Sequence, residues 1–229
     1  MNQHIDLFGL LYNKRHRLPD SEIIKEKIQV DQLHDWLQED GSDGELSLLY
    51  RGSRDGFGAA SFHSKCDKQG STLTIIETTD GYVLGGYTNI EWRSGGIGGP
   101  HHDTPNKAFI FTLPGGDVAV PRKMTLKDSN DKSAVVHIDD NGPTFGAGHD
   151  LNVESSTLNV YMGKLGSSYE ASSLEGHLVQ SVSGSYTKMP IKEIEVFQVS
   201  TENKEETTQT NTSATNIPEK WLAANSFIH

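Results

Sequence analysis

The chain has 229 residues, of which 34% are hydrophobic, and 31 acidic against 20 basic side chains give a formal net charge of −11. This length is sufficient for one well-buried core with tails and is short for two domains. The acidic balance argues against nucleic-acid binding, because a phosphate backbone is bound by clustered Lys and Arg. We expect a protein partner with a basic or mixed surface.

Cysteine content and hydropathy predict a cytoplasmic protein. The single cysteine, Cys66, excludes an intramolecular disulfide and suits a reducing compartment. No run approaches the roughly 18 apolar residues of a membrane span, and the amino terminus lacks the basic-then-apolar pattern of a secretory signal. The protein is therefore expected in the cytosol or at the cytosolic face of an organelle.

Residues 1–20 form an N-terminal lead-in, with an apolar run at 5–12 followed by a short basic cluster. This segment either packs on the edge of the domain or contacts a partner or lipid surface, and its short length favours packing. From Ser21, a plausible N-cap, apolar side chains including Ile28 follow helical spacings up to Gly41. One or two short helices are predicted there.

Residues 46–51 read as a strand, 53–56 as a turn, and the following stretch as a helix that buries four side chains: Phe57, Ala60, Phe62 and Cys66. A hairpin is predicted over 72–87, because Asp80-Gly81 is a strong tight-turn signal between two apolar runs. Residues 92–106 read as a long surface loop. Further strands are predicted at 108–113, 117–120, 134–138, 150–154, 157–161 and 192–199.

Many short strands with glycine-marked turns and few helices predict a mainly β fold with flanking helices, an antiparallel β-sandwich, over residues 21–199. In the last strand, Ile194 and Val196 are expected on one face, with Glu195 and Phe197 on the other. Residues 200–229 are polar and are expected to be disordered. The apolar end, residues 221–229, either docks back, binds a partner or is a plain terminus.

Four runs have glycines beside aromatic or aliphatic side chains or form a closing strand: LLYRGSRDGFGAASFHSKC at 48–66, YVLGGY at 82–87, GPTFGAGHD at 142–150 and IKEIEVFQV at 191–199. In order and spacing they resemble the TLDc domain of oxidation-resistance proteins. The resemblance implies a non-enzymatic interaction module that protects against oxidative stress, with the proton-pumping vacuolar ATPase as the best partner. It implies no cofactor and identifies no interface.

His149 and Asp150 are the most suggestive polar pair, since an adjacent carboxylate can orient or charge an imidazole. Neighbours on a strand face opposite ways, however, so we first interpret the run as backbone geometry, with Gly148 needing a positive φ or a close approach. The alternative is an enzyme or small-ligand-binding protein with a pocket beside His149, Asp150 and Glu195.

Two histidine-containing runs at 101–103 and 137–140 lack the spacing of a zinc site, and no metal is expected. Cys66 either packs in the core or acts as a redox-sensing thiol. The charges of Lys65 and Lys68 are offset by Asp67, and no second cysteine can resolve an oxidised thiol, so we interpret Cys66 as a packing residue.

Overall fold

The computed structural model describes residues 18, 20–42, 44–94, 107–129, 131, 134–163, 165–171 and 187–200. The predictions for the lead-in before residue 18, for the polar tail with its 221–229 end, and for the histidines at 101–102 lie outside the described residues. The predicted loop at 92–106 is described only to Ser94. No helix in the described ranges is both long and apolar enough to cross a membrane.

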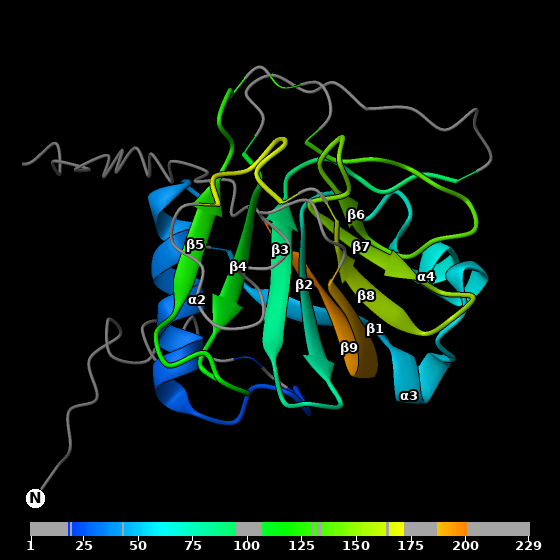
Figure 1. Cartoon of the computed structure of the whole chain (residues 1–229), viewed down its shortest axis with the longest axis horizontal. Coiled ribbons are helices and arrows are strands. Elements are labelled where there is room, and N and C mark those ends of the chain that lie inside the picture. Colours follow the sequence, from blue (N-terminus) through cyan, green and yellow to red (C-terminus); the bar gives the residue numbers. More distant parts are fainter. Residues whose placement is uncertain are drawn as a thin grey trace, which may run out of the picture.

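One antiparallel sheet of nine strands forms most of the described structure, which confirms the predicted mainly β fold with flanking helices (Figure 1). The strand order is β5-β4-β3-β2-β9-β8-β7-β6, and β1 pairs with β9. The bounds are β1 Leu46–Arg51, β2 Thr72–Thr78, β3 Val83–Thr88, β4 Phe109–Leu113, β5 Arg122–Thr125, β6 Thr144–Phe145, β7 Leu151–Glu154, β8 Asn159–Met162 and β9 Thr187–Val199.

The sheet folds into two layers that enclose the larger core. The first layer contains β5, β4, β3 and β2, and the second layer contains β8, β7 and β6. Side chains of β2, β3 and β4 share one buried cluster with side chains of β6, β7 and β8. The layers are in close contact, because a Cβ placed on Gly86 of β3 would lie 2.7 Å from the Phe145 ring of β6. Glycine at position 86 therefore allows an aromatic ring from the second layer to sit directly on the first.

Strand β9 belongs to both layers. Residues 187–190 pair with β8, whereas the residues after them pair with β2 and β1 across a register irregularity. The strand starts five residues before its predicted beginning. Ile194 and Val196 lie in the core between the layers and Phe197 in the other core, which confirms their predicted alternation. Both faces of this part of β9 are buried.

Helix α2, Lys27–Glu39, covers the outer face of the first layer (Figure 1). Its buried side chains are Val30, Leu33, His34, Trp36 and Leu37. The predicted start at Ser21 is wrong, because Ser21 Oγ accepts the amide N–H groups of Ile23 and Ile24 in a turn that precedes the helix. Ile28 was expected on the apolar face, but its side chain is 77% exposed.

Two short helices, α3 at Gly52–Asp55 and α4 at Ala59–Cys66, follow β1. The segment predicted as a turn at 53–56 is thus mostly helical. Helix α4 begins two residues after Phe57 and buries Ala59, Phe62, His63 and Cys66, whereas Ala60 is exposed. The buried residues follow the i, i+3, i+4, i+7 spacing of one helical face, and Ala60 lies off that face.

Three strand assignments need correction. The strand predicted at 117–120 forms at Arg122–Thr125 instead, because the loop closes earlier through a bridge between Gly115 and Val118. The segment at 134–138 forms no strand of its own; Val135 makes an isolated bridge to Phe145, and the Val136 N–H donates to the Thr144 carbonyl at 3.0 Å. The short strand β6 that contains Phe145 was not predicted, since two residues carry too little periodicity to be recognised.

Candidate functional site

The outer surface of the second layer carries a row of polar side chains. Leu151, Val153 and Val160 point into the core, so the alternate residues Asn152 and Tyr161 face outward. The strand register aligns four residues across the layer, with the pairs Thr144–Asn152, Asn152–Tyr161 and Tyr161–Lys188. A continuous polar line therefore runs from β6 to β9.

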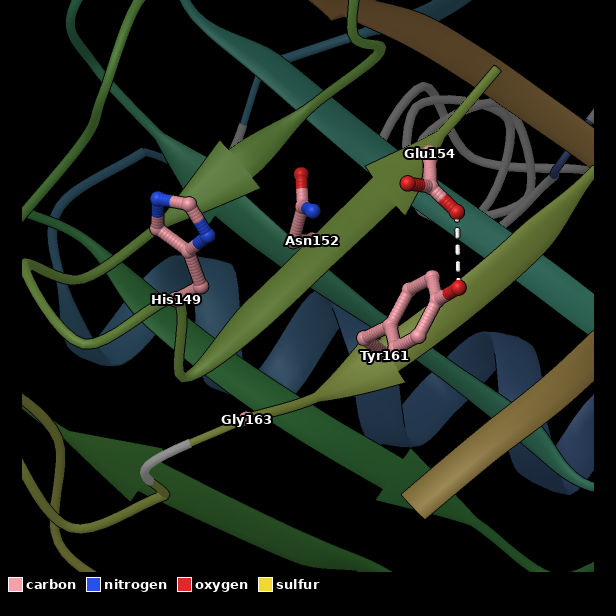
Figure 2. A pocket seen from close by; sticks show the side chains of 5 residues that line it. All are labelled: His149, Asn152, Glu154, Tyr161 and Gly163. Carbon is pink, nitrogen blue, oxygen red and sulfur yellow. Dashed lines mark hydrogen bonds between the residues drawn. The ribbon is translucent and has the colours of Figure 1, made fainter. Parts of the chain in front are cut away.

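A pocket of about 260 Å³ opens on this surface. It is lined by His149, Asn152, Glu154, Tyr161 and Gly163. Figure 2 shows Asn152 between the His149 ring and the Glu154 carboxylate, with the Tyr161 ring beside Glu154. Gly163 has no side chain, and its N–H donates to the His149 carbonyl at 2.9 Å, which fixes the turn before β7 against the end of β8.

The turn that carries His149 depends on left-handed backbone at two positions. Gly146 has φ +83° and His149 has φ +55°, and the His149 N–H donates to the Gly146 carbonyl at 2.9 Å. Of the two alternatives expected for Gly148, the positive φ is wrong, because Gly148 is not among the left-handed residues of the described chain. A left-handed histidine is uncommon and costs free energy, so the surrounding turn must enforce it.

Asp150 faces away from the pocket. Its buried carboxylate accepts the backbone N–H groups of residues 166–169 at 2.9 to 3.3 Å. Burial raises the pKa of Asp150, and the four N–H donors oppose that rise. The structure thus separates His149 from Asp150, as expected for neighbours at the start of a strand, and it places Asp150 as an anchor for the loop at 165–171.

Glu154 brings the negative charge to the pocket. Its Oε2 accepts the Tyr161 hydroxyl at 2.6 Å and also the Thr157 hydroxyl. These two hydrogen bonds, with a smaller contribution from Lys188, lower the pKa of Glu154, so the carboxylate is ionised at neutral pH. Both bonds meet Oε2, and Figure 2 shows the second oxygen on the side of Asn152.

Glu195 lies in a separate buried cluster. Its Oε1 accepts Arg51 Nε and the Glu22 N–H, each at 2.8 Å, and its Oε2 accepts the Ser21 hydroxyl at 2.6 Å. Arg51 also donates to the Asp20 carbonyl. This Glu195 cluster fastens residues 20–22 to β1 and β9. Glu195 therefore does not join His149 in one pocket.

Cys66 is fully buried at the end of α4, within the core between the layers. Burial raises the pKa of its thiol, and the nearby carboxylates of Asp67 and Asp55 raise it further. The thiol is therefore protonated at neutral pH. A protonated, inaccessible thiol is a poor nucleophile.

The described residues hold no group of three or more His, Cys, Asp or Glu side chains placed to bind a metal ion. His137, Asp139 and Asp140 belong to this described part, whereas the run at 101–103 does not.

Sequence reasoning missed Asn152, Glu154 and Tyr161. A usable signal was present, since strands were predicted at 150–154 and 157–161 and residues 152, 154 and 161 alternate with apolar ones. Pairing the strands as a hairpin would have placed all three on the outward face. The register that brings Tyr161 opposite Asn152 is a property of the folded hairpin.

The family model for the TLDc domain matches residues 18–200 of the chain. No curated protein matches the chain at a significant level. The matched range contains every strand and helix described above.

Proposed function

The chain belongs to the TLDc domain family, and we propose that it is a protein-interaction module that helps protect cells against oxidative stress by contacting the vacuolar proton ATPase. The observation that carries this proposal is the family match, which spans residues 18–200. The net charge of −11 supports a protein partner with basic surface and disfavours nucleic acid.

The arrangement of buried polar groups is consistent with binding rather than catalysis. The carboxylates of Asp150 and Glu195 are engaged by backbone N–H groups, Ser21 and Arg51. Such fully bonded groups stabilise a fold and are not free to move protons to a substrate. We propose that the working surface of the domain lies outside these clusters.

The partner is tested by capture with the tagged full-length chain. Lysate of cells with an intact vacuolar ATPase is passed over the immobilised protein, and the ATPase subunits are detected by immunoblot. We expect ATPase subunits to be retained, and retention to weaken as salt is raised, because the proposed contact is between opposite charges. Capture no greater than on an unrelated β-sandwich of similar net charge would reject the ATPase as partner.

Stress protection and cellular location are tested in the same cells. Cells that lack the protein should recover peroxide tolerance when the full-length chain is expressed. Fractionation should find the chain in the cytosol, with a portion on ATPase-containing membranes. Normal peroxide tolerance of cells without the protein would count against the protective function.

A second candidate function is small-ligand binding in the pocket beside His149. The pocket itself favours this candidate, with His149 and Glu154 both lining it. In this version Glu154 takes the place that was expected for Asp150. A His149→Ala variant that is fully stable by chemical denaturation and yet loses stress protection supports the pocket as the working site. Full protection by this variant argues against it.

A further inference from the structure

We propose that the pocket lined by His149, Asn152, Glu154, Tyr161 and Gly163 receives an arginine side chain from a protein partner. This inference rests on the proposed function as an interaction module and names the chemistry of one contact. It assigns no partner identity.

Charge is the first argument. Glu154 is the acidic residue that lines the pocket, and its lowered pKa keeps it ionised. One carboxylate oxygen is held by Tyr161 and Thr157, so the group is fixed in position while its other oxygen can accept a new donor. A preorganised carboxylate at a partly open surface is suited to a cationic group and repels an anionic one.

Lys188 would compete with an incoming cation for the Glu154 carboxylate. It stands opposite Tyr161 in the strand register, with its Nζ 5.6 Å from the Tyr161 ring centroid. Its side chain is exposed and does not line the pocket. An exposed lysine on a flexible stem is easily displaced, so Lys188 lowers the affinity of the pocket for an incoming cation without excluding it.

Shape and hydrogen bonding favour arginine among cationic side chains. The volume of about 260 Å³ is below that of pockets for drug-sized ligands and fits one long side chain. The His149 and Tyr161 rings line the pocket, and a planar guanidinium can stack on such a ring in addition to the cation–π attraction that an ammonium such as that of Lys188 also has. The fork of guanidinium N–H donors also matches a carboxylate.

Asn152 can contact the peptide chain that carries the arginine. Its Oδ1 accepts the Thr144 hydroxyl at 2.7 Å and the Asn141 amide at 3.2 Å, which orients the amide. The remaining Nδ2 is a donor and cannot bond a guanidinium. It can donate to a main-chain carbonyl beside the arginine.

The experiment is a titration of the ¹⁵N-labelled full-length chain with acetyl-Gly-Arg-Gly amide, followed by two-dimensional NMR. The isosteric citrulline peptide is the matched ligand control, since it keeps the shape and loses the charge. We expect saturable shifts at the Asn152 side-chain amide and at the Gly163 N–H. The citrulline peptide should bind at least about tenfold more weakly than the arginine peptide, since it loses the charge-assisted bond.

Three variants complete the test. Glu154→Gln should weaken arginine-peptide binding about tenfold, whereas Glu26→Gln, an equal charge change on the helix-covered side, should not. Lys188→Ala should strengthen binding about twofold to fivefold, because it removes the competing cation. Equal binding of the citrulline peptide, shifts confined to other surfaces, or no shifts at high peptide concentration would overturn the proposal.

The outcomes separate this inference from the proposed function. If Glu154→Gln abolishes peptide binding and leaves ATPase capture unchanged, the pocket binds arginine but does not serve that partner, and the inference fails as a partner contact. If the arginine peptide binds as expected while no ATPase is captured, the pocket chemistry stands and the ATPase proposal fails. Loss of both binding and capture in Glu154→Gln supports both.

Discussion

Two carboxylates of the same chemical type, Glu195 and Glu154, have opposite environments in this domain. Glu195 is fully buried, and its oxygens accept bonds from Arg51, Ser21 and the Glu22 N–H. Glu154 is partly exposed, with its bonds gathered on one oxygen beside a pocket. A carboxylate whose partners are all internal stabilises the fold, whereas one with an open oxygen can contribute to binding.

The largest effect is expected from Glu195→Ala. This change leaves the mostly buried Arg51 without its carboxylate, which costs about 3–5 kcal/mol of unfolding free energy when one partner of a buried pair is removed. Chemical denaturation of the full-length chain measures it, with Glu154→Ala as the matched control that should leave the denaturation midpoint close to wild type. A loss below about 1 kcal/mol in Glu195→Ala would contradict the assigned role of the Glu195 cluster.

Gly146→Ala should be the next most damaging change. Gly146 has φ +83°, and an added Cβ would lie 2.0 Å from Asp150 Oδ2, so both the turn and the anchored loop must shift. We expect a loss of about 1–3 kcal/mol by chemical denaturation. The same change at Gly148 is the control and should cost less, since no left-handed backbone is required there. Equal losses at the two glycines would show that the turn does not depend on Gly146.

Cys66 should behave as a buried structural residue, like Glu195. Because burial raises its pKa, the thiol is protonated at pH 7, and native-state alkylation by iodoacetamide should be on the order of 100-fold slower than in denaturant. Mass spectrometry of timed samples measures the rates. Cys66→Ser, if folded, should retain peroxide protection. Rapid alkylation of the native chain, or lost protection in a folded variant, would instead identify a functional thiol.

Trimming the chain to residues 18–200 should have the smallest effect. The retained start keeps Leu18 in the core under α2 and residues 20–22 in the Glu195 cluster, and the retained end keeps the Ser200 N–H bonded to the Glu45 carbonyl. We expect an unchanged Tm by differential scanning fluorimetry. A fall of more than about 3 °C, roughly 1 kcal/mol for a domain of this size, would show that a removed segment docks on the domain. Starting at residue 26 instead should lower the Tm clearly, because it empties one side of the Glu195 cluster.

Local sequence patterns predicted the elements that local physics fixes. The hairpin of β2 and β3 follows from an Asp-Gly turn between apolar runs, and β1 from a short apolar run. The start of α2 was missed because Ser21, which has the chemistry of an N-cap, bonds N–H groups of a turn before the helix and the carboxylate of Glu195. A serine that caps a helix and a serine that bonds a turn before the helix look the same in the sequence.

The family, the mainly β fold and the alternation of Ile194, Val196 and Phe197 in β9 were determined by the sequence alone, because glycine placement, turn chemistry and alternation act over a few residues. The partners of each carboxylate were decided only by the tertiary structure. Glu195 meets Ser21 across 174 positions of the chain, and Glu154 meets Tyr161 through one hairpin register. Glu195 therefore stabilises the fold and Glu154 lines a pocket. The two glutamates differ because burial and hydrogen-bond partners depend on which distant backbone packs beside each side chain.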